Sequence, residues 1–164
     1  MRDLSLHLMD IVQNSISAGS TCIFIKIHGD KLHDQLCITV EDNGEGMEQK
    51  FLDKVTDPFT TGRTTRKVGL GISLFKASAE RASGELNISS EKGKGTVLSA
   101  VFEISHIDRP TLGNIAETMV NLIMAEPEIK WSLILSNSID DYEFNSLEVK
   151  QRLGEVPITE FEVI

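Results

Sequence analysis

Two pairs of strand-like segments, each pair joined by a short turn, place the strongest constraint on how this chain folds. The segments are rich in Ile, Val and Thr, which favour strands, and they span residues 22–28, 35–41, 86–90 and 96–104. A polar connection, 29–34, joins the first pair, and the turn 91–95 joins the second. Because strands joined by short turns pair in antiparallel fashion, the sequence predicts a mainly antiparallel sheet.

Helical segments lie before, between and after these predicted strands. Most of them show apolar residues at spacings of three and four, and they span residues 4–18, 48–55, 69–82, 112–125 and 147–153. Two further strands are expected at 129–135 and 142–144. The whole pattern predicts an α/β fold with helices on one face of a mixed, mainly antiparallel sheet.

The composition excludes several classes of protein. The chain has 164 residues, and its 16 Lys and Arg stand against 25 Asp and Glu, so its net charge is −9. Such a chain lacks the basic surface of a general nucleic-acid binder, although a local basic cluster can bind one phosphorylated ligand. No apolar run approaches the ~20 residues of a membrane span, and the N-terminus lacks a signal-peptide core. We therefore expect a cytoplasmic protein with no membrane partner.

A change of composition at residues 105–111 divides the chain into two parts. We expect one domain over residues 1–105 and an α/β extension of unknown role over residues 106–164. The extension contains an apolar stripe at helical spacing, formed by Leu112, Ile115, Met119, Leu122 and Ile123. This stripe could pack on the open side of the sheet or bind another chain.

The segment Asp42-Asn43-Gly44-Glu45-Gly46-Met47, at the end of a predicted strand, is the strongest local signal for a ligand site. A carboxylate followed by two glycines lets the backbone pass close to a flat ligand, and the carboxylate can accept a hydrogen bond from an exocyclic amine. A simple turn after a strand is the alternative, because Asp-Asn-Gly suits a turn equally well.

A second signal lies on the first predicted helix, where Asp10 and Asn14 are four residues apart on the polar face. Oxygen ligands on one helix face suit Mg²⁺, which takes its remaining ligands from waters and phosphates. A carboxylate one turn away can orient or deprotonate a water. The alternative is a helix face turned to solvent.

A basic, threonine-rich loop over residues 60–68 leads into Gly69-Leu70-Gly71, where a helix is expected to begin. The loop has no apolar face, so we expect it to be mobile, and free amides at a helix N-terminus suit phosphate oxygens. A solvated charged loop is the alternative.

Gly93-Lys94-Gly95-Thr96 forms a tight turn into a strand, and neither a P-loop nor a Rossmann glycine fingerprint occurs.

Together, and in this order, these segments resemble the ATP-binding domain of the GHKL superfamily, which includes gyrase, heat-shock chaperones, histidine kinases and mismatch-repair ATPases. Residues 10–19 resemble its N box, and residues 42–47 resemble its first glycine box. Asp57-Pro58-Phe59 and residues 68–74 resemble the phenylalanine motif and second glycine box of histidine kinases. The resemblance covers about residues 1–105 and implies a two-layer α/β sandwich that stands alone as an ATP-binding module.

The resemblance also implies a role for each matched residue. Asn14 would coordinate Mg²⁺, Asp42 would bind the adenine amine, and Thr96 would support water beside Asp42. Gly44 and Gly46 would make room for the base, and backbone amides would meet the phosphates under a lid over residues 60–68. The implied ATP-binding set is Asn14, Asp42, Gly44, Gly46, Met47, Thr60, Lys67, Gly69, Leu70, Gly71 and Thr96, with Arg63 and Arg66 as weaker phosphate candidates.

One residue departs from the pattern of the hydrolysing relatives. They usually carry Glu one turn before the asparagine, whereas this chain has Asp10, which is one methylene shorter and would need a closer catalytic water. Two functions therefore stay open: slow hydrolysis or transfer of the γ-phosphate to a partner protein, with Asp10 as the catalytic residue, or a non-catalytic ATP-dependent switch. A structural domain without a working pocket is a third alternative, against which the intact motif residues argue.

A histidine kinase also needs a phosphoacceptor helix, normally upstream of its ATP domain. Only three residues precede the first predicted helix here, so we expect no such helix. Residues 105–112, around His106, resemble an acceptor pattern, but they lie downstream and contain Pro110. A strand-to-helix turn is the favoured interpretation of this segment.

Overall fold

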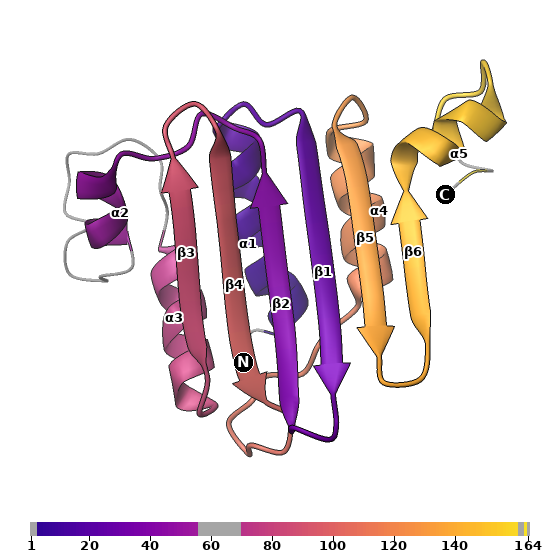
Figure 1. Ribbon diagram of the computed structural model, residues 1–164. Helices are drawn as coiled ribbons and strands as arrows, with labels where there is room; N and C mark the ends of the chain where they lie inside the picture. The colour runs from indigo at the N-terminus through magenta and orange to yellow at the C-terminus, as the bar shows by residue number, and fades with distance from the viewer. Residues whose placement is uncertain (1–2, 56–69, 161–162, 164) are drawn as a thin grey trace.

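The computed structural model describes residues 3–55, 70–160 and 163 of the chain, and these residues build one six-stranded sheet with helices packed against one face (Figure 1). In chain order the elements are α1 (Leu4–Ser17), β1 (Cys22–Asp30), β2 (Gln35–Asp42), α2 (Gln49–Val55), α3 (Gly71–Arg81), β3 (Glu85–Glu91), β4 (Gly95–Glu103), α4 (Ile115–Ala125), β5 (Lys130–Asn137), β6 (Asp141–Asn145) and α5 (Ser146–Leu153). The α/β prediction is confirmed.

The strands lie in the order β3-β4-β2-β1-β5-β6. All neighbours pair antiparallel except β1 and β5, which run parallel. The connection that contains α4 leads from β4, past β2 and β1, to β5. In the pairing of β2 with β4, Asp42 lies opposite Thr96. The register therefore brings two of the predicted ligand residues side by side at one end of the sheet.

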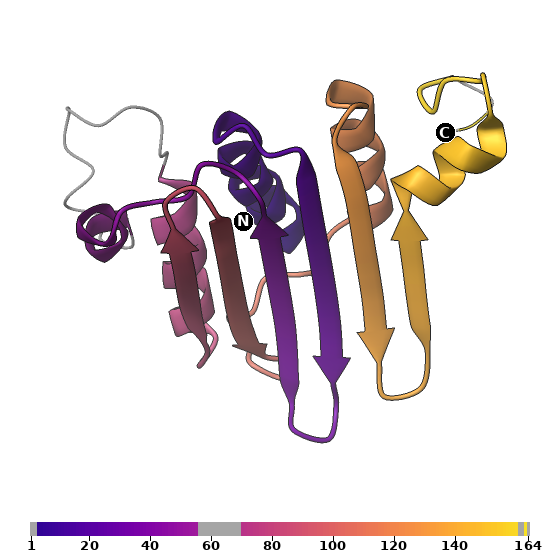
Figure 2. The same ribbon diagram turned by 45° about the horizontal axis from the view of Figure 1, so that its top comes forward.

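The core lies between the sheet and the layer formed by α1, α3 and α4, which both views place behind the strands (Figures 1 and 2). Side chains alternate across each strand, so Ile23, Ile25 and Ile27 of β1 point into this layer and are buried. The sheet's other face has no helix over it among the described residues. None of the helices in the described part of the chain is long and apolar enough to cross a membrane.

The polar side of α1 is turned toward α3, not toward solvent. His7, three residues before Asp10 on the same helix, is only 5% exposed and stacks on Phe75 of α3 with ring centroids 5.4 Å apart. Asp10 and Asn14 are half-buried. α3 therefore covers this side of α1 at His7 and Asp10, whereas Ser17 near the end of the helix is exposed.

Residues 106–160 add α4, β5, β6 and α5 to the same sheet and core. The predicted apolar stripe is largely buried, and it faces the sheet in the same layer as α1. The helix begins at Ile115, three residues later than predicted, because Gly113 has a φ of +78° and Asn114 caps the helix by accepting from the Glu117 amide. The division into two domains at residue 105 stays a prediction.

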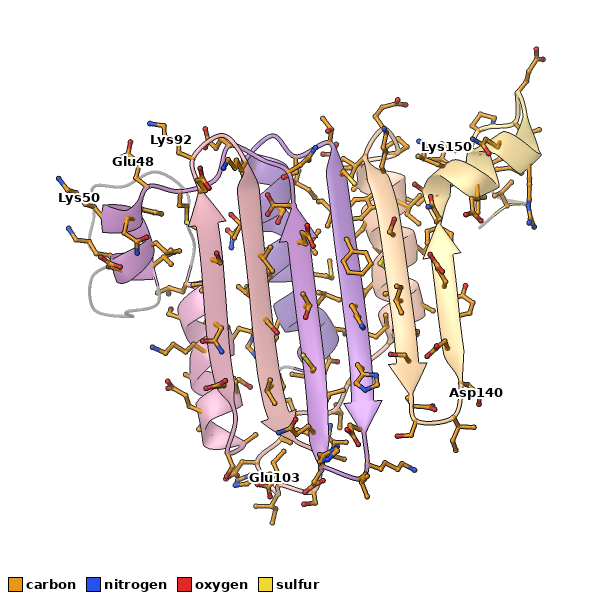
Figure 3. All side chains as sticks on the ribbon, viewed as in Figure 1. Glu48, Lys50, Lys92, Glu103, Asp140 and Lys150 are labelled. Carbon is orange, nitrogen blue, oxygen red and sulfur yellow. The ribbon has the colours of Figure 1, made fainter. Side chains whose placement is uncertain are left out.

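The segment around His106 is a turn. The His106 amide donates to the Glu103 carbonyl at 3.3 Å, and the Arg109 amide donates to the His106 carbonyl at 3.1 Å. Glu103, and with it this turn, lies at one end of the sheet, whereas Glu48 and Lys92 lie at the other end (Figure 3). A helix around His106, as a phosphoacceptor role would require, is therefore not formed.

Candidate functional site

A cavity of about 390 Å³ opens where β2 ends, between α1, α2, α3 and the sheet. Its floor is apolar and includes the buried side chains of Val40, Ile72 and Leu98, while polar and charged groups stand around its entrance. The full lining is Ile11, Asn14, Ser15, Ser17, Ala18, Val40, Asp42, Glu45, Gly46, Met47, Glu48, Phe51, Ile72, Ile88, Lys92, Thr96 and Leu98. A flat, largely apolar ligand with a few polar groups suits such a site.

The carboxylate of Asp42 is held in one position by three donors. The Ser15 hydroxyl donates to Oδ2 at 2.6 Å, while the Ser20 hydroxyl and the Gly44 amide donate to Oδ1 at 3.1 and 2.9 Å. These donors come from α1, from the α1–β1 loop and from the chain just after β2. An ionised carboxylate accepts up to about four hydrogen bonds, so these three donors leave one acceptor position of Asp42, which lines the cavity, for a ligand.

Ser15, Ser20 and Asn43 support the site, and sequence reasoning missed their roles. The Asn43 side chain accepts from the amides of Thr21 and Cys22, both at 2.9 Å, and so ties the end of β2 to the start of β1. Ser15 could have been found as the one polar residue in the apolar stripe of the first helix. For Ser20 the sequence contains no comparable signal.

The two glycines that follow Asp42 are required by contacts within the protein itself. A Cβ on Gly46, whose φ is +63°, would lie 2.1 Å from the Glu91 carbonyl oxygen. A Cβ on Gly44 would lie 2.7 Å from the Ser20 hydroxyl and 2.9 Å from the Ala18 side chain. Gly46 lines the cavity and Gly44 does not. Close packing between loops thus explains both glycines without any ligand.

A second hydrogen-bond network joins Thr96 to the glycine-rich segment. The hydroxyls of Thr96 and Ser90 share a hydrogen bond of 2.8 Å, and Ser90 also accepts from the Met47 amide at 2.8 Å. Ser90 donates to the Gly95 carbonyl at 2.9 Å. Met47 and Thr96, both predicted ligand residues, are therefore held together through Ser90, a third serine that the sequence did not single out.

Asn14 lines the cavity from α1, and its amide nitrogen Nδ2 is buried with no hydrogen-bond partner among the described residues. A buried amide without a partner is costly, so this position favours a polar ligand. The residues that the structure describes contain no cluster of three or more His, Cys, Asp or Glu for a metal. A Mg²⁺ ion at Asn14 would therefore draw its other ligands from waters and from the ligand.

Asp10 lies one turn before Asn14, beside the start of α3 and outside the cavity lining. A Cβ on Gly71 would lie 3.0 Å from the Asp10 Cβ, so the two helices touch at this point. Leu70 stands at the N-cap of α3 and makes no side-chain capping hydrogen bond. Leu70 and Gly71 do not line the cavity, although Ile72 does. The predicted residues Thr60, Lys67 and Gly69 lie outside the described part of the chain.

An ion pair stands at the cavity entrance and was not predicted. The Lys92 ammonium donates to the Glu48 carboxylate at 2.7 Å, joining the β3–β4 turn to the residue before α2 (Figure 3). The hydrogen bond from Lys92 lowers the pKa of Glu48, and the same bond raises the pKa of Lys92. Both side chains are well exposed, so water weakens the pair.

Comparison with known proteins identifies the family. A family model described as histidine kinase-, DNA gyrase B-, and HSP90-like ATPase matches residues 2–106, nearly two thirds of the chain. The chain belongs to this family. The predicted superfamily is thereby confirmed, and ATP binding is supported for this histidine kinase-like ATPase domain.

Relatives of the domain include two bacterial kinases. Autoinducer 2 sensor kinase/phosphatase LuxQ of Vibrio cholerae is 33% identical over 112 residues, covering 63% of this chain and 13% of the relative. Sporulation kinase C of Bacillus subtilis is 31% identical over 96 residues, covering 58% of this chain and 22% of the relative. The chain thus spans less than a quarter of either kinase.

A solved structure shares the fold over most of the chain. The MutL ATPase domain of Aquifex aeolicus, which was determined in complex with ADP, aligns with a TM-score of 0.53 at 13% identity. The alignment covers 93% of this chain and 68% of that one. At this identity the similarity establishes the fold alone, and it includes the extension as well as the family-matched part.

Replacing Gly46 with Ala should destabilise the protein more than replacing Gly93 with Ala. Both glycines have positive φ, +63° and +83°, but an added Cβ meets a carbonyl only at Gly46. We expect the Gly46 variant to lose about 1–3 kcal/mol more of the free energy of unfolding, measured by urea titration. Equal losses in the two variants would contradict the close approach to Glu91.

Proposed function

We propose that this chain is a Mg²⁺-dependent ATP-binding protein that hydrolyses ATP slowly or transfers its γ-phosphate to a partner protein. The observation that carries the proposal is the Asp42 carboxylate, which three donors fix at the entrance of an apolar-floored cavity. Family membership supports ATP as the ligand. The metal, the chemistry and the partner go beyond what family membership supports.

Asp42 gives the cavity a preference for adenine. Its free acceptor position can bind the exocyclic amine of adenine, whereas guanine has a carbonyl oxygen there and would set acceptor against acceptor. The buried side chains of Val40, Ile72 and Leu98 offer an apolar surface to the flat base. The solved MutL domain contains ADP, which agrees with a purine nucleotide of this kind.

Asn14 and the start of α3 suit the phosphate end of the nucleotide. The Asn14 amide can supply an oxygen ligand to Mg²⁺, and a bound Mg²⁺ would neutralise the charge of phosphate oxygens. Leu70 and Gly71 begin α3 without a capping side chain, so its first amides suit an anion. Asp10 lies at the contact between α1 and α3, where it can orient or deprotonate a water.

A non-catalytic switch is the second candidate function. It is favoured by Asp10, which is shorter than the Glu expected in the hydrolysing relatives and lies outside the cavity lining. In a switch, the nucleotide would change a protein-binding surface without being consumed. The cited kinase relatives favour a protein partner in either case, although the chain matches less than a quarter of each.

The Asp42→Asn variant tests the adenine assignment. It keeps the size of the side chain but removes its charge, and loss of one charge-assisted hydrogen bond should cost about 1.5–3 kcal/mol, or roughly ten- to a hundred-fold in affinity for ATP. Calorimetric titration measures the affinity, with GTP expected to bind more weakly to the unchanged protein. Asp140→Asn, an equal change of charge on an exposed residue at the other end of the sheet, is the control (Figure 3). Unchanged ATP affinity in a folded Asp42→Asn variant would refute the assignment.

The Asn14→Ala variant tests the metal ligand. If Asn14 holds Mg²⁺, the variant should weaken the binding of ATP with Mg²⁺ by about tenfold or more, and the binding of ATP in excess chelator much less. The matched control is Gln13→Ala, because Gln13 is the exposed neighbour on the same helix. Equal losses with and without Mg²⁺ would show that Asn14 contacts the nucleotide or the fold instead.

A single-turnover experiment with γ-labelled ATP separates the two candidate functions. We expect slow release of labelled phosphate, lowered about a hundredfold or more by Asp10→Asn because a general base is lost, with ATP affinity nearly unchanged. Transfer to a protein would instead appear as label on a protein band when a candidate partner is added. Tight ATP binding with neither product would leave the switch as the function.

A further inference from the structure

The helix layer stops short of the last strand of the sheet. The described helices α1, α3 and α4 lie behind β1–β5, and none of them lies behind β6 (Figures 1 and 2). An apolar groove of about 310 Å³ occupies this position beside α4. It lies in the extension, beyond residues 2–106 that the family model covers, and shares no residue with the nucleotide cavity.

Every side chain of the groove is apolar apart from the hydroxyl of one tyrosine. Ala116 and Val120 line it from α4, Leu133 and Leu135 from β5, and Tyr142 from β6. Val149 of α5 and the later residues Ile158 and Val163 line it as well. Tyr142 is 57% exposed, which is high for an aromatic residue on the core-facing side of a sheet. Ala116 is exposed as well, so the groove keeps an open apolar edge between α4 and β6, and such an edge marks a place where another element packs.

The charges around the groove define what can occupy it. Residues 106–164 contain 11 Asp and Glu against 4 Lys and Arg, so this third of the chain carries −7 of the net charge of −9. Glu117 and Glu148 are exposed and each adjoins a groove-lining residue in sequence, whereas Glu143, between Tyr142 and Phe144 on β6, points to the sheet's other face. Among the few cations, Lys150 is held by the Pro127 carbonyl. A second copy of the chain in the groove would bring two acidic surfaces together, and their repulsion disfavours it as the occupant.

We infer that the groove binds an amphipathic helix of a partner protein, with its apolar side chains in the groove and Lys or Arg on its outer face. Such a helix would complete the layer behind β6, in line with α4, at the usual separation of about 8–10 Å between packed helices. Its cations would meet the acidic residues that adjoin the groove. The inference rests on the extension alone and holds whether or not the nucleotide assignment is correct.

A model peptide tests the inference on the full chain. The probe is a 14-residue helix of Leu and Lys with Leu at spacings of three and four, compared with a scrambled peptide of the same composition and with a Leu/Glu version. We expect the amphipathic Leu/Lys peptide to bind at least tenfold more tightly than either. Methyl NMR should show shifts at Val120, Ile123 and Leu135, and none at Val40 and Leu98 in the other cavity.

Two substitutions on α4 form a matched pair. Ala116→Arg places a cation in the groove and should weaken binding of the Leu/Lys peptide at least tenfold, whereas Asn121→Arg adds the same charge at an exposed position of α4 outside the groove and should change it less than twofold. Tyr142→Lys, at the exposed edge on β6, is the second test variant if Ala116→Arg does not fold.

Three outcomes would overturn the inference. Equal binding of the scrambled peptide, or equal effects of Ala116→Arg and Asn121→Arg, would show general attraction between opposite charges. Equal binding of the Leu/Glu peptide would show that charge plays no part. Self-association of the unchanged protein that Ala116→Arg abolishes, measured by sedimentation, would assign the groove to a second copy of the chain.

Discussion

The hydrogen bonds that converge on Asp42 hold together the elements that form the candidate nucleotide cavity. A half-buried carboxylate loses hydration on folding, and the donors from Ser15, Ser20 and Gly44 replace it. Because these donors belong to α1, the α1–β1 loop and the chain just after β2, the same bonds fix the distance between the helix layer and the sheet at this end. The position of Asn14 on α1, relative to Asp42, follows from them.

Backbone contacts close the cavity on its other side. The Gly93 amide donates to the Glu45 carbonyl at 2.7 Å, and Gly46 lies so close to Glu91 that only a hydrogen atom fits between them. The β3–β4 turn is thereby fastened to the glycine-rich segment after β2. In this arrangement the glycines serve the packing of the protein first, and the space for a ligand is a consequence of where the two loops meet.

Local patterns predicted most of the fold, and the parts they missed depend on contacts between distant segments. Strands joined by short turns were predicted from β-branched residues and turn chemistry, because those signals are local. The parallel pairing of β5 with β1 could not be predicted in this way, since nothing within residues 129–135 specifies the neighbour of that strand. The start of α4 was placed too early because Leu112 fits the apolar spacing of the helix. Gly113, between Leu112 and the helix, has a positive φ and is not helical.

The candidate site shows the same division between local and distant information. Asn14, Asp42, Gly46, Met47 and Thr96 were named from the resemblance of their motifs to the family, and the structure brings all five to one cavity, although their roles stay predictions. Ser20 and Ser90 were not named, because a serine hydroxyl acquires its role only from the group it meets in three dimensions. The ion pair between Lys92 and Glu48 joins residues 44 positions apart and has no sequence signature.

The distribution of charge allows an acidic chain to bind an anionic ligand. Residues 1–105 contain 14 Asp and Glu against 12 Lys and Arg, so the part that forms the cavity is nearly neutral, and the acidic excess lies in the extension. Three strand spacings separate β2 from β6, roughly 14 Å at about 4.8 Å each, which exceeds the Debye length of about 8 Å at physiological ionic strength. Repulsion between the extension and nucleotide phosphates is therefore largely screened. An acidic extension at one edge of the sheet is therefore compatible with the proposed phosphate site near the other edge.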